Sequence, residues 1–208
     1  MSALDTLLHE LAGSGPPELL AVVLALVYLI LAARLNLWCW PAAFVSTAIY
    51  LWLFAERQLY QQALLQIFYL AMAVYGFVQW RAGMHARDGA IARWSAKQHA
   101  VAVVSVLVLT LVTGVLEARY TDAPMPYLDA FTTWGSVVTT WMVARRVLEN
   151  WLYWIVVDGV LVYVSFASGL IATAGLFLLY LGIVIAGYFA WRRRLAAAAP
   201  GGAAGAVA

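Results

Sequence analysis

The residues best placed to do chemistry lie inside hydrophobic runs, and their types suit binding rather than catalysis. Asn150, Trp154 and Asp158 follow one another at intervals of four, which places them on one face of a helix. A carboxylate inside an apolar run is costly without a partner, so Asp158 is a functional candidate. A carboxylate beside aromatic faces suits a flat, cationic ring.

Other polar side chains recur at helical spacing in the neighbouring hydrophobic runs. Asp129, Thr133, Ser136 and Thr140 form one polar stripe. Amide and hydroxyl groups in such positions can hydrogen-bond sugar hydroxyls or a carboxamide. We therefore expect one mid-membrane cavity lined by Gln66, Tyr69, Thr133, Ser136, Trp154, Asp158 and Tyr180.

The elements that position these residues are predicted to be membrane-spanning helices. The 208 residues are 65% hydrophobic and 11% charged, with a mean hydropathy of +0.87. A soluble domain has about a quarter charged residues, and a helix needs roughly 20 residues to cross a bilayer. An all-α membrane protein is predicted, with seven transmembrane helices at 18–35, 38–55, 60–80, 98–116, 127–147, 150–168 and 170–191.

Basic residues predict the orientation. Of the 12 lysines and arginines, all but Arg57 and Arg119 fall in loops that would share one side of the membrane. By the positive-inside rule this side is cytoplasmic, which places the N-terminus outside and the C-terminus inside. Residues 1–17 are then a periplasmic segment, and residues 192–208 are expected to be a disordered cytoplasmic tail.

The chain repeats part of itself, which predicts its internal symmetry. Tyr69, Gly76 and Trp80 recur 111 positions later as Tyr180, Gly187 and Trp191. Asn36 and Trp40 match Asn150 and Trp154 at an offset of 114, which predicts a three-residue insertion in a loop. Two parallel three-helix repeats, 18–80 and 127–191, joined by a linker helix at 98–116, give a 3+1+3 plan with the site between the repeats.

Several of these residues also have a purely structural interpretation. Serine and threonine in membrane helices often bond their own backbone or join helices. Trp80 and Trp191 lie beside arginines and are expected in the interfacial aromatic belt. Asn36 and Asn150 begin helices and suit N-caps, and the paired glycines suit close packing.

Other protein classes fit poorly. The single cysteine, Cys39, excludes an intramolecular disulfide and a multi-cysteine metal site. The sole lysine, Lys97, lies outside any phosphate-binding G-x4-G-K-[ST] loop and outside the last helix, which excludes ATP drive by this chain and a retinal Schiff base there. With no nucleophile–base pair, we expect no enzyme, no cofactor and no metal.

Three motifs carry a resemblance to a known family. They are Glu149-Asn150-Trp151-x2-Trp154-x3-Asp158, Leu65-Gln66-x2-Tyr69 with Tyr75-Gly76-x3-Trp80, and Tyr180-x6-Gly187-x3-Trp191. In this order they resemble the PnuC family of bacterial vitamin transporters, over roughly residues 19–194.

The resemblance implies a SWEET-like homotrimer in the inner membrane that takes up nicotinamide riboside by facilitated diffusion. Intracellular phosphorylation would trap this substrate. It adds Trp151 to the expected substrate-binding residues and supports Gln66, Tyr69, Trp154 and Asp158, with Tyr180 following by symmetry. Thiamine and riboflavin are the alternative substrates. A sugar uniporter of the SWEET type is a less favoured alternative function. The expected partners are the vitamin, the lipid bilayer and two further copies of the chain, with no nucleic acid.

Overall fold

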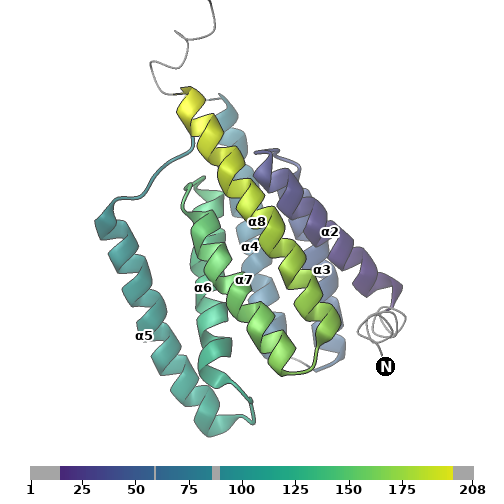
Figure 1. Ribbon diagram of the computed structural model, residues 1–208. Coiled ribbons are helices and arrows are strands. Elements are labelled where there is room, and N and C mark those ends of the chain that lie inside the picture. The colour runs from purple at the N-terminus through teal and green to yellow at the C-terminus, as the bar shows by residue number, and fades with distance from the viewer. Residues whose placement is uncertain (1–14, 59, 86–89, 199–208) are drawn as a thin grey trace, which may run out of the picture.

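The computed structural model describes residues 15–58, 60–85 and 90–198, and every regular element within them is a helix (Figure 1). In order these are α2 (Pro16–Ala33), α3 (Cys39–Glu56), α4 (Tyr60–His85), α5 (Ala96–Tyr120), α6 (Pro126–Ala144), α7 (Asn150–Ala167) and α8 (Ile171–Ala198). Six of the seven described helices are long and apolar enough to cross a membrane. The predicted seven-helix, all-α architecture is confirmed at this level.

The helix ends differ from the prediction in places where the sequence signal is weak. α8 continues to Ala198, although residues from 192 onward were expected to be a disordered tail. Arginine and alanine are strong helix formers, so the arginine run extends the helix. α6 ends at Ala144 rather than at 147, and Arg146 takes a φ of 53° in the turn that follows. The predicted terminal segments are 1–17 and 192–208, and their outer parts, residues 1–14 and 199–208, lie outside the described residues.

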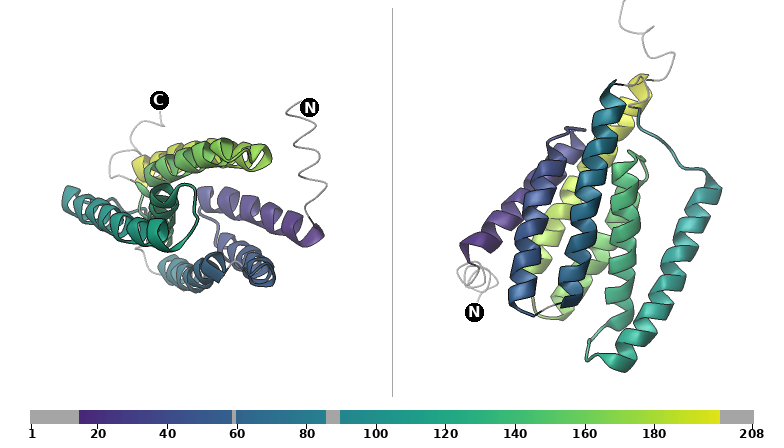
Figure 2. Two further views of the ribbon diagram at one scale, coloured as in Figure 1. Left: turned by 90° about the horizontal axis from the view of Figure 1, so that it is seen from below. Right: turned by 180° about the vertical axis from the view of Figure 1, so that it is seen from behind.

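α6 is the described helix that lacks a stretch apolar enough to count as a membrane span, and it lies in the interior. It contacts α4, α5 and α7, and Figure 2 shows it enclosed between them. Four buried residues on it carry hydroxyls: Thr132, Ser136, Thr139 and Thr140. Some of these are satisfied within the helix, as where Thr139 Oγ1 donates to the Gly135 carbonyl at 2.6 Å. Because its neighbours cover α6, it does not need a lipid-compatible surface.

The helices α2–α3–α4 and α6–α7–α8 have the same local structure. α3 begins at Cys39 and α7 at Asn150, a difference of 111 in residue number, and the ends Glu56 and Ala167 differ by the same amount. Left-handed backbone also recurs at this offset, at Leu35 and Arg146 and at Gln58 and Gly169. We call these two groups the first and the second triplet.

The expected three-residue insertion is therefore wrong, and the counterpart of Trp40 is Trp151 rather than Trp154. The two asparagines share a residue type but not a role. Asn36 Oδ1 accepts a hydrogen bond from the Trp38 amide in a loop, whereas Asn150 is the first residue of α7 and donates to the Val147 carbonyl. Neither caps a helix through a side chain.

Four tryptophans, Trp40, Trp80, Trp151 and Trp191, form one buried cluster, which we call the Trp cluster; each is at most 2% exposed. Trp40 and Trp80 meet edge to face at 5.5 Å, and Trp151 and Trp191 do so at 5.3 Å. The rings of Trp80 and Trp191 lie 6.2 Å apart and join the two pairs. The expectation that Trp80 and Trp191 lie in an interfacial belt is thus wrong.

The Trp cluster also joins the triplets through hydrogen bonds. Trp80 Nε1 donates to the Val143 carbonyl at 3.2 Å, and Trp191 Nε1 donates to the Ala32 carbonyl at 3.1 Å. The donors are 111 residues apart, and so are the acceptors. Each triplet therefore donates one bond to the other and accepts one from it.

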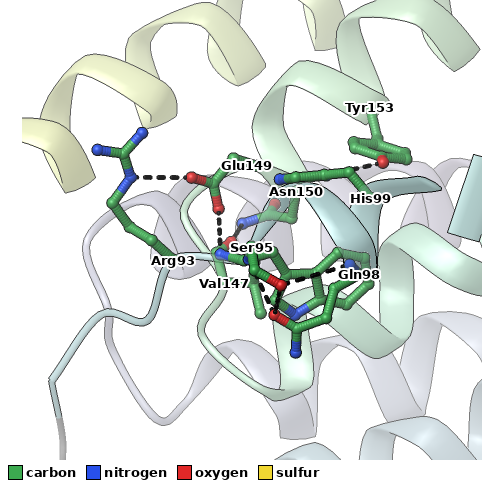
Figure 3. A network of polar contacts seen from close by, with 9 residues as sticks. Arg93, Ser95, Gln98, His99, Val147, Glu149, Asn150 and Tyr153 are labelled. Atoms are coloured by element: carbon green, nitrogen blue, oxygen red, sulfur yellow. Dashed lines mark hydrogen bonds and ion pairs between the residues drawn. The ribbon is translucent and has the colours of Figure 1, made fainter. Parts of the chain in front are cut away.

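The linker helix α5 packs along α6 at the edge of the bundle. The chain before it is held to the turn between α6 and α7, where Ala92 N donates to the Arg146 carbonyl at 3.0 Å. Buried Glu149 accepts from Arg93 Nε at 3.0 Å and from the Trp94 amide at 3.2 Å, as Figure 3 shows in part. These contacts attach the linker to the second triplet.

The close contact between Gly187 and Trp151 predicts a specific loss of stability. A Cβ at Gly187 would lie 2.7 Å from the Trp151 ring, whereas a Cβ at Gly182 in the same helix would meet nothing within 4 Å. We expect Gly187→Ala to lower the free energy of unfolding by about 1–3 kcal/mol through overpacking. Gly182→Ala is the matched control and should be neutral or slightly stabilising. Equal melting temperatures of the two variants in detergent would contradict this packing.

Candidate substrate-binding site

Two tyrosines at matched positions face across the boundary between the triplets. The hydroxyl of Tyr69 of α4 lies near that of Ser136 of α6. Tyr180 of α8 lies near Tyr50 of α3 and Asp158 of α7. Each tyrosine therefore links its own triplet to the other one. The interior polar groups lie where the triplets meet.

Asp158 is the most unusual group in this interior. The residue is 3% exposed, and no hydrogen bond to its carboxylate forms within the described part of the chain, although Tyr180 lies nearby. The other buried carboxylate among the described residues, Glu149, is bound to Arg93. A carboxylate without a hydrogen bond is costly among membrane-crossing helices, which makes Asp158 a candidate for contact with a ligand.

The remaining predicted site residues are placed less tightly. Trp154 is half-buried and packs against the core beside the Trp cluster. Gln66 and Thr133 are half-buried too, and within the described residues no hydrogen bond joins them to the tyrosines or to Asp158. Trp151 is 1% exposed and packs on Gly187 and Trp191, which is the environment of a packing residue.

Two further tyrosines belong to this interior. Tyr50 lies near Tyr180, and its ring stacks on Phe54 at 5.7 Å. Tyr28 lies near Tyr69, and its ring lies 6.0 Å from that of Trp40. Neither tyrosine was among the residues predicted from the sequence to bind the substrate. Their only signal is a hydroxyl inside a hydrophobic run, which does not reveal which way the side chain faces.

Two apolar recesses lie elsewhere on the bundle. One, of about 500 Å³, lies between α2 and α8 and includes Ile30, Gly182 and Ala186. The other, of about 430 Å³, lies among α5, α6 and α7 and includes Val103, Phe131 and Val156. No predicted substrate-binding residue lines either recess. Their apolar lining distinguishes them from the polar interior between the triplets.

The fold and the site together define a class of protein. Membrane-crossing helices surround a carboxylate and several hydroxyls at the boundary of two matched helix groups, which is where carriers bind a small polar molecule. This is the arrangement of a multi-pass membrane transporter.

Comparison with known proteins agrees with this class and identifies the family. The family model described as "Nicotinamide mononucleotide transporter" matches residues 16–193, so the chain belongs to that family, whose relatives include PnuC. The crystal structure of the vitamin B3 transporter PnuC superposes with a TM-score of 0.72 at 17% identity, covering 93% of this chain and 87% of that one. This likeness confirms the fold.

Curated relatives of this chain differ in what they carry. The riboflavin/roseoflavin transporter RibM of Streptomyces davaonensis is 29% identical over 180 residues, covering 84% of this chain and 83% of that protein. The nicotinamide riboside transporter PnuC of Escherichia coli is 26% identical over 165 residues, covering 67% and 69%. The names of these relatives thus include more than one vitamin.

The contact between the Tyr69 and Ser136 hydroxyls predicts an energetic coupling between the triplets. Tyr69→Phe and Ser136→Ala each remove one of the two hydroxyls, so together they should cost less than the sum of their separate effects. We expect a coupling of about 0.5–1.5 kcal/mol in denaturant unfolding of the purified protein. The control pair is Ser136→Ala with Tyr163→Phe, because Tyr163 is 60% exposed. Additive effects in the first pair would contradict the contact.

Proposed function

We propose that this protein takes up nicotinamide riboside across the bacterial inner membrane by facilitated diffusion. The observation that carries the proposal is Asp158, a buried carboxylate to which no hydrogen bond forms among the described residues. The pyridinium ring of nicotinamide riboside is flat and positively charged, so it supplies what this carboxylate lacks. Membership of a transporter family supports the uptake role.

The other site residues suit the remainder of the substrate. Tyr180 lies next to Asp158, and half-buried Trp154 lies one helical turn before it, so both can present aromatic faces to a cationic ring. Tyr69 from the first triplet and Ser136 from α6 of the second triplet offer neighbouring hydroxyls at the triplet boundary. Gln66 and Thr133 are proposed to bond the ribose or the carboxamide. Trp151 would act by holding the Trp154 helix in place.

We infer that transport uses a SWEET-like 3+1+3 plan of two parallel repeats. The common offset of 111 in helix bounds and in left-handed residues supports it. Tilting one triplet against the other would expose the site to each side in turn. Uniport is favoured, because the second buried carboxylate of the described residues, Glu149, is already paired with Arg93. Phosphorylation of the vitamin inside the cell would then trap it.

The topology and assembly of the protein are part of the same proposal. Described arginines such as Arg34, Arg81 and Arg145 follow or end helices at one end of the bundle, which we place in the cytoplasm, with the N-terminus outside and the C-terminus inside. A homotrimer follows from the resemblance to the PnuC family. Light scattering of the detergent-solubilised protein would measure the number of copies.

Riboflavin is the second candidate, and one observation favours it: the RibM relative matches this chain at 29% identity over 84% of its length. The flavin ring is also flat but uncharged, so it would not need Asp158 as a counter-ion. Thiamine shares the positive charge of nicotinamide riboside and fits the same argument. A sugar lacks both the charge and the flat ring and fits least well.

Ligand-induced thermal stabilisation of the purified protein tests the substrate assignment. Binding to the native state raises its stability, so each true ligand must raise the melting temperature. We expect a shift with nicotinamide riboside and none with glucose, and riboflavin and thiamine are tested alongside. A shift with riboflavin alone would replace the proposed substrate, and a shift with glucose alone would overturn the vitamin assignment.

The charge of Asp158 provides a sharper prediction. Asp158→Asn keeps the shape of the side chain but removes its charge, and a charge-assisted contact is worth about 1.5–3 kcal/mol. Binding of nicotinamide riboside should weaken by about 10–100-fold, measured by isothermal titration calorimetry. The control is Asp122→Asn, which makes the same change at an exposed loop residue and should leave affinity unchanged. Unaltered affinity in Asp158→Asn would remove the counter-ion role.

A further inference from the structure

The Trp cluster lies on the route between the polar interior and the arginine-rich end of the bundle. Trp80 follows Tyr69 by 11 residues on α4, and Trp191 follows Tyr180 by 11 on α8. This spacing keeps each pair on one helix face and separates its members by roughly 16 Å along the axis. Arg81 and Arg192 come directly after the two tryptophans. The Trp cluster is therefore the layer between the tyrosines and that end.

This layer spans the boundary between the triplets and is closed. Trp40 and Trp80 come from the first triplet, and Trp151 and Trp191 come from the second. None of the four is more than 2% exposed. The rings of Trp80 and Trp191 meet across the boundary at 6.2 Å. A substrate moving from the interior to the arginine-rich side would have to pass between them.

Three hydrogen bonds hold the layer shut. Two are the reciprocal bonds from Trp80 to the Val143 carbonyl and from Trp191 to the Ala32 carbonyl. The third runs from Arg146 Nη2 to the Trp80 carbonyl at 2.8 Å, and this guanidinium also lies 5.1 Å from the Trp80 ring. All three cross from one triplet to the other. Separating the triplets at this end must break them.

We propose that Trp80 and Trp191 form the gate on the arginine-rich side, and that this gate is closed in the structure. Opening breaks the two reciprocal bonds and the bond from Arg146 to the Trp80 carbonyl as the triplets tilt apart. The inference deepens the proposed transport function and rests on it, because a gate has a purpose only if a substrate passes. It assigns to the two tryptophans a role in conformational exchange rather than in substrate contact.

The closed layer also contains groups that favour its opening. The indole N–H groups of Trp40 and Trp151 are buried and have no acceptor among the described residues. A buried donor without an acceptor destabilises the state that contains it. In the closed gate, two indole N–H groups thus donate hydrogen bonds and two have no acceptor. Such a balance keeps the closed state from being too stable to open, as a transport cycle requires.

The chain contains a natural reporter of this gate. Cys39 is its only cysteine, is 0% exposed, and packs in the same core as the Trp cluster. A small thiol reagent, methyl methanethiosulfonate, can reach Cys39 only when the layer opens. When opening and closing are fast relative to modification, the labelling rate follows the open population.

The test compares variants that lose a gate bond but keep an aromatic ring. Trp80→Phe and Trp191→Phe each remove one indole donor, and each should raise the labelling rate of Cys39 by about fivefold, the factor that corresponds to one hydrogen bond. Trp52→Phe makes the same change at a residue that is 53% exposed and should leave the rate unchanged. Labelling that is unchanged in both gate variants, or faster in only one of them, overturns the reciprocal gate.

A further variant guards against simple loss of folding. Arg146→Gln leaves all four tryptophans intact but removes the bond to the Trp80 carbonyl, so it should also accelerate labelling while the melting temperature stays within a few degrees of wild type. Slow labelling in this folded variant would count against the gate. Labelling is measured without substrate. Failure of every vitamin to bind would therefore remove the proposed function, while faster labelling of the variants would still establish the moving layer.

Discussion

The relative position of the two triplets depends on where two buried indole N–H groups find acceptors. Trp80 and Trp191 lie among membrane-crossing helices, where no water satisfies a donor. The Ala32 and Val143 carbonyls lie in the last turns of α2 and α6, and each accepts an amide of the following turn and, with its second lone pair, the indole N–H. Each tryptophan thus joins the end of its own triplet to the end of the other.

The helices divide the remaining tasks according to their surroundings. α6 is enclosed and can hold hydroxyls, including that of Ser136, which lies near the Tyr69 hydroxyl. α5 is peripheral and exposes apolar side chains such as Leu107 and Leu111. Its attachment through Glu149 links it to the second triplet, next to the turn that carries Arg146. Polarity in this bundle therefore increases from the edge toward the triplet boundary.

Local patterns predicted much of this structure, and contacts between distant segments explain most of what they missed. Apolar runs located all seven helices, and helical spacing placed Tyr69 with Trp80. The predicted match of Trp40 with Trp154 is wrong because it relied on Asn36 and Asn150, which are similar only in residue type. The burial of Trp191 was not predicted because its hydrogen-bond acceptor, the Ala32 carbonyl, lies 159 residues away in the sequence. The direction of the Tyr28 side chain likewise depends on contacts with a neighbouring helix, and no local sequence pattern encodes such contacts.

A substrate without symmetry must be recognised by residues that differ between the matched positions. Tyr69 and Tyr180 are the same in both triplets and shape a common framework. Asp158, by contrast, corresponds at the offset of 111 to Thr47, and Ser136 corresponds to Ala25. The charge therefore lies in the second triplet alone and gives the site an electrostatic direction. If the substrate is the cationic vitamin proposed above, its charged ring lies toward α7 and its hydroxyl-bearing part toward Tyr69 of the first triplet. On this view, exchanging Asp158 for a neutral residue changes which vitamin is preferred while leaving the framework that moves it intact.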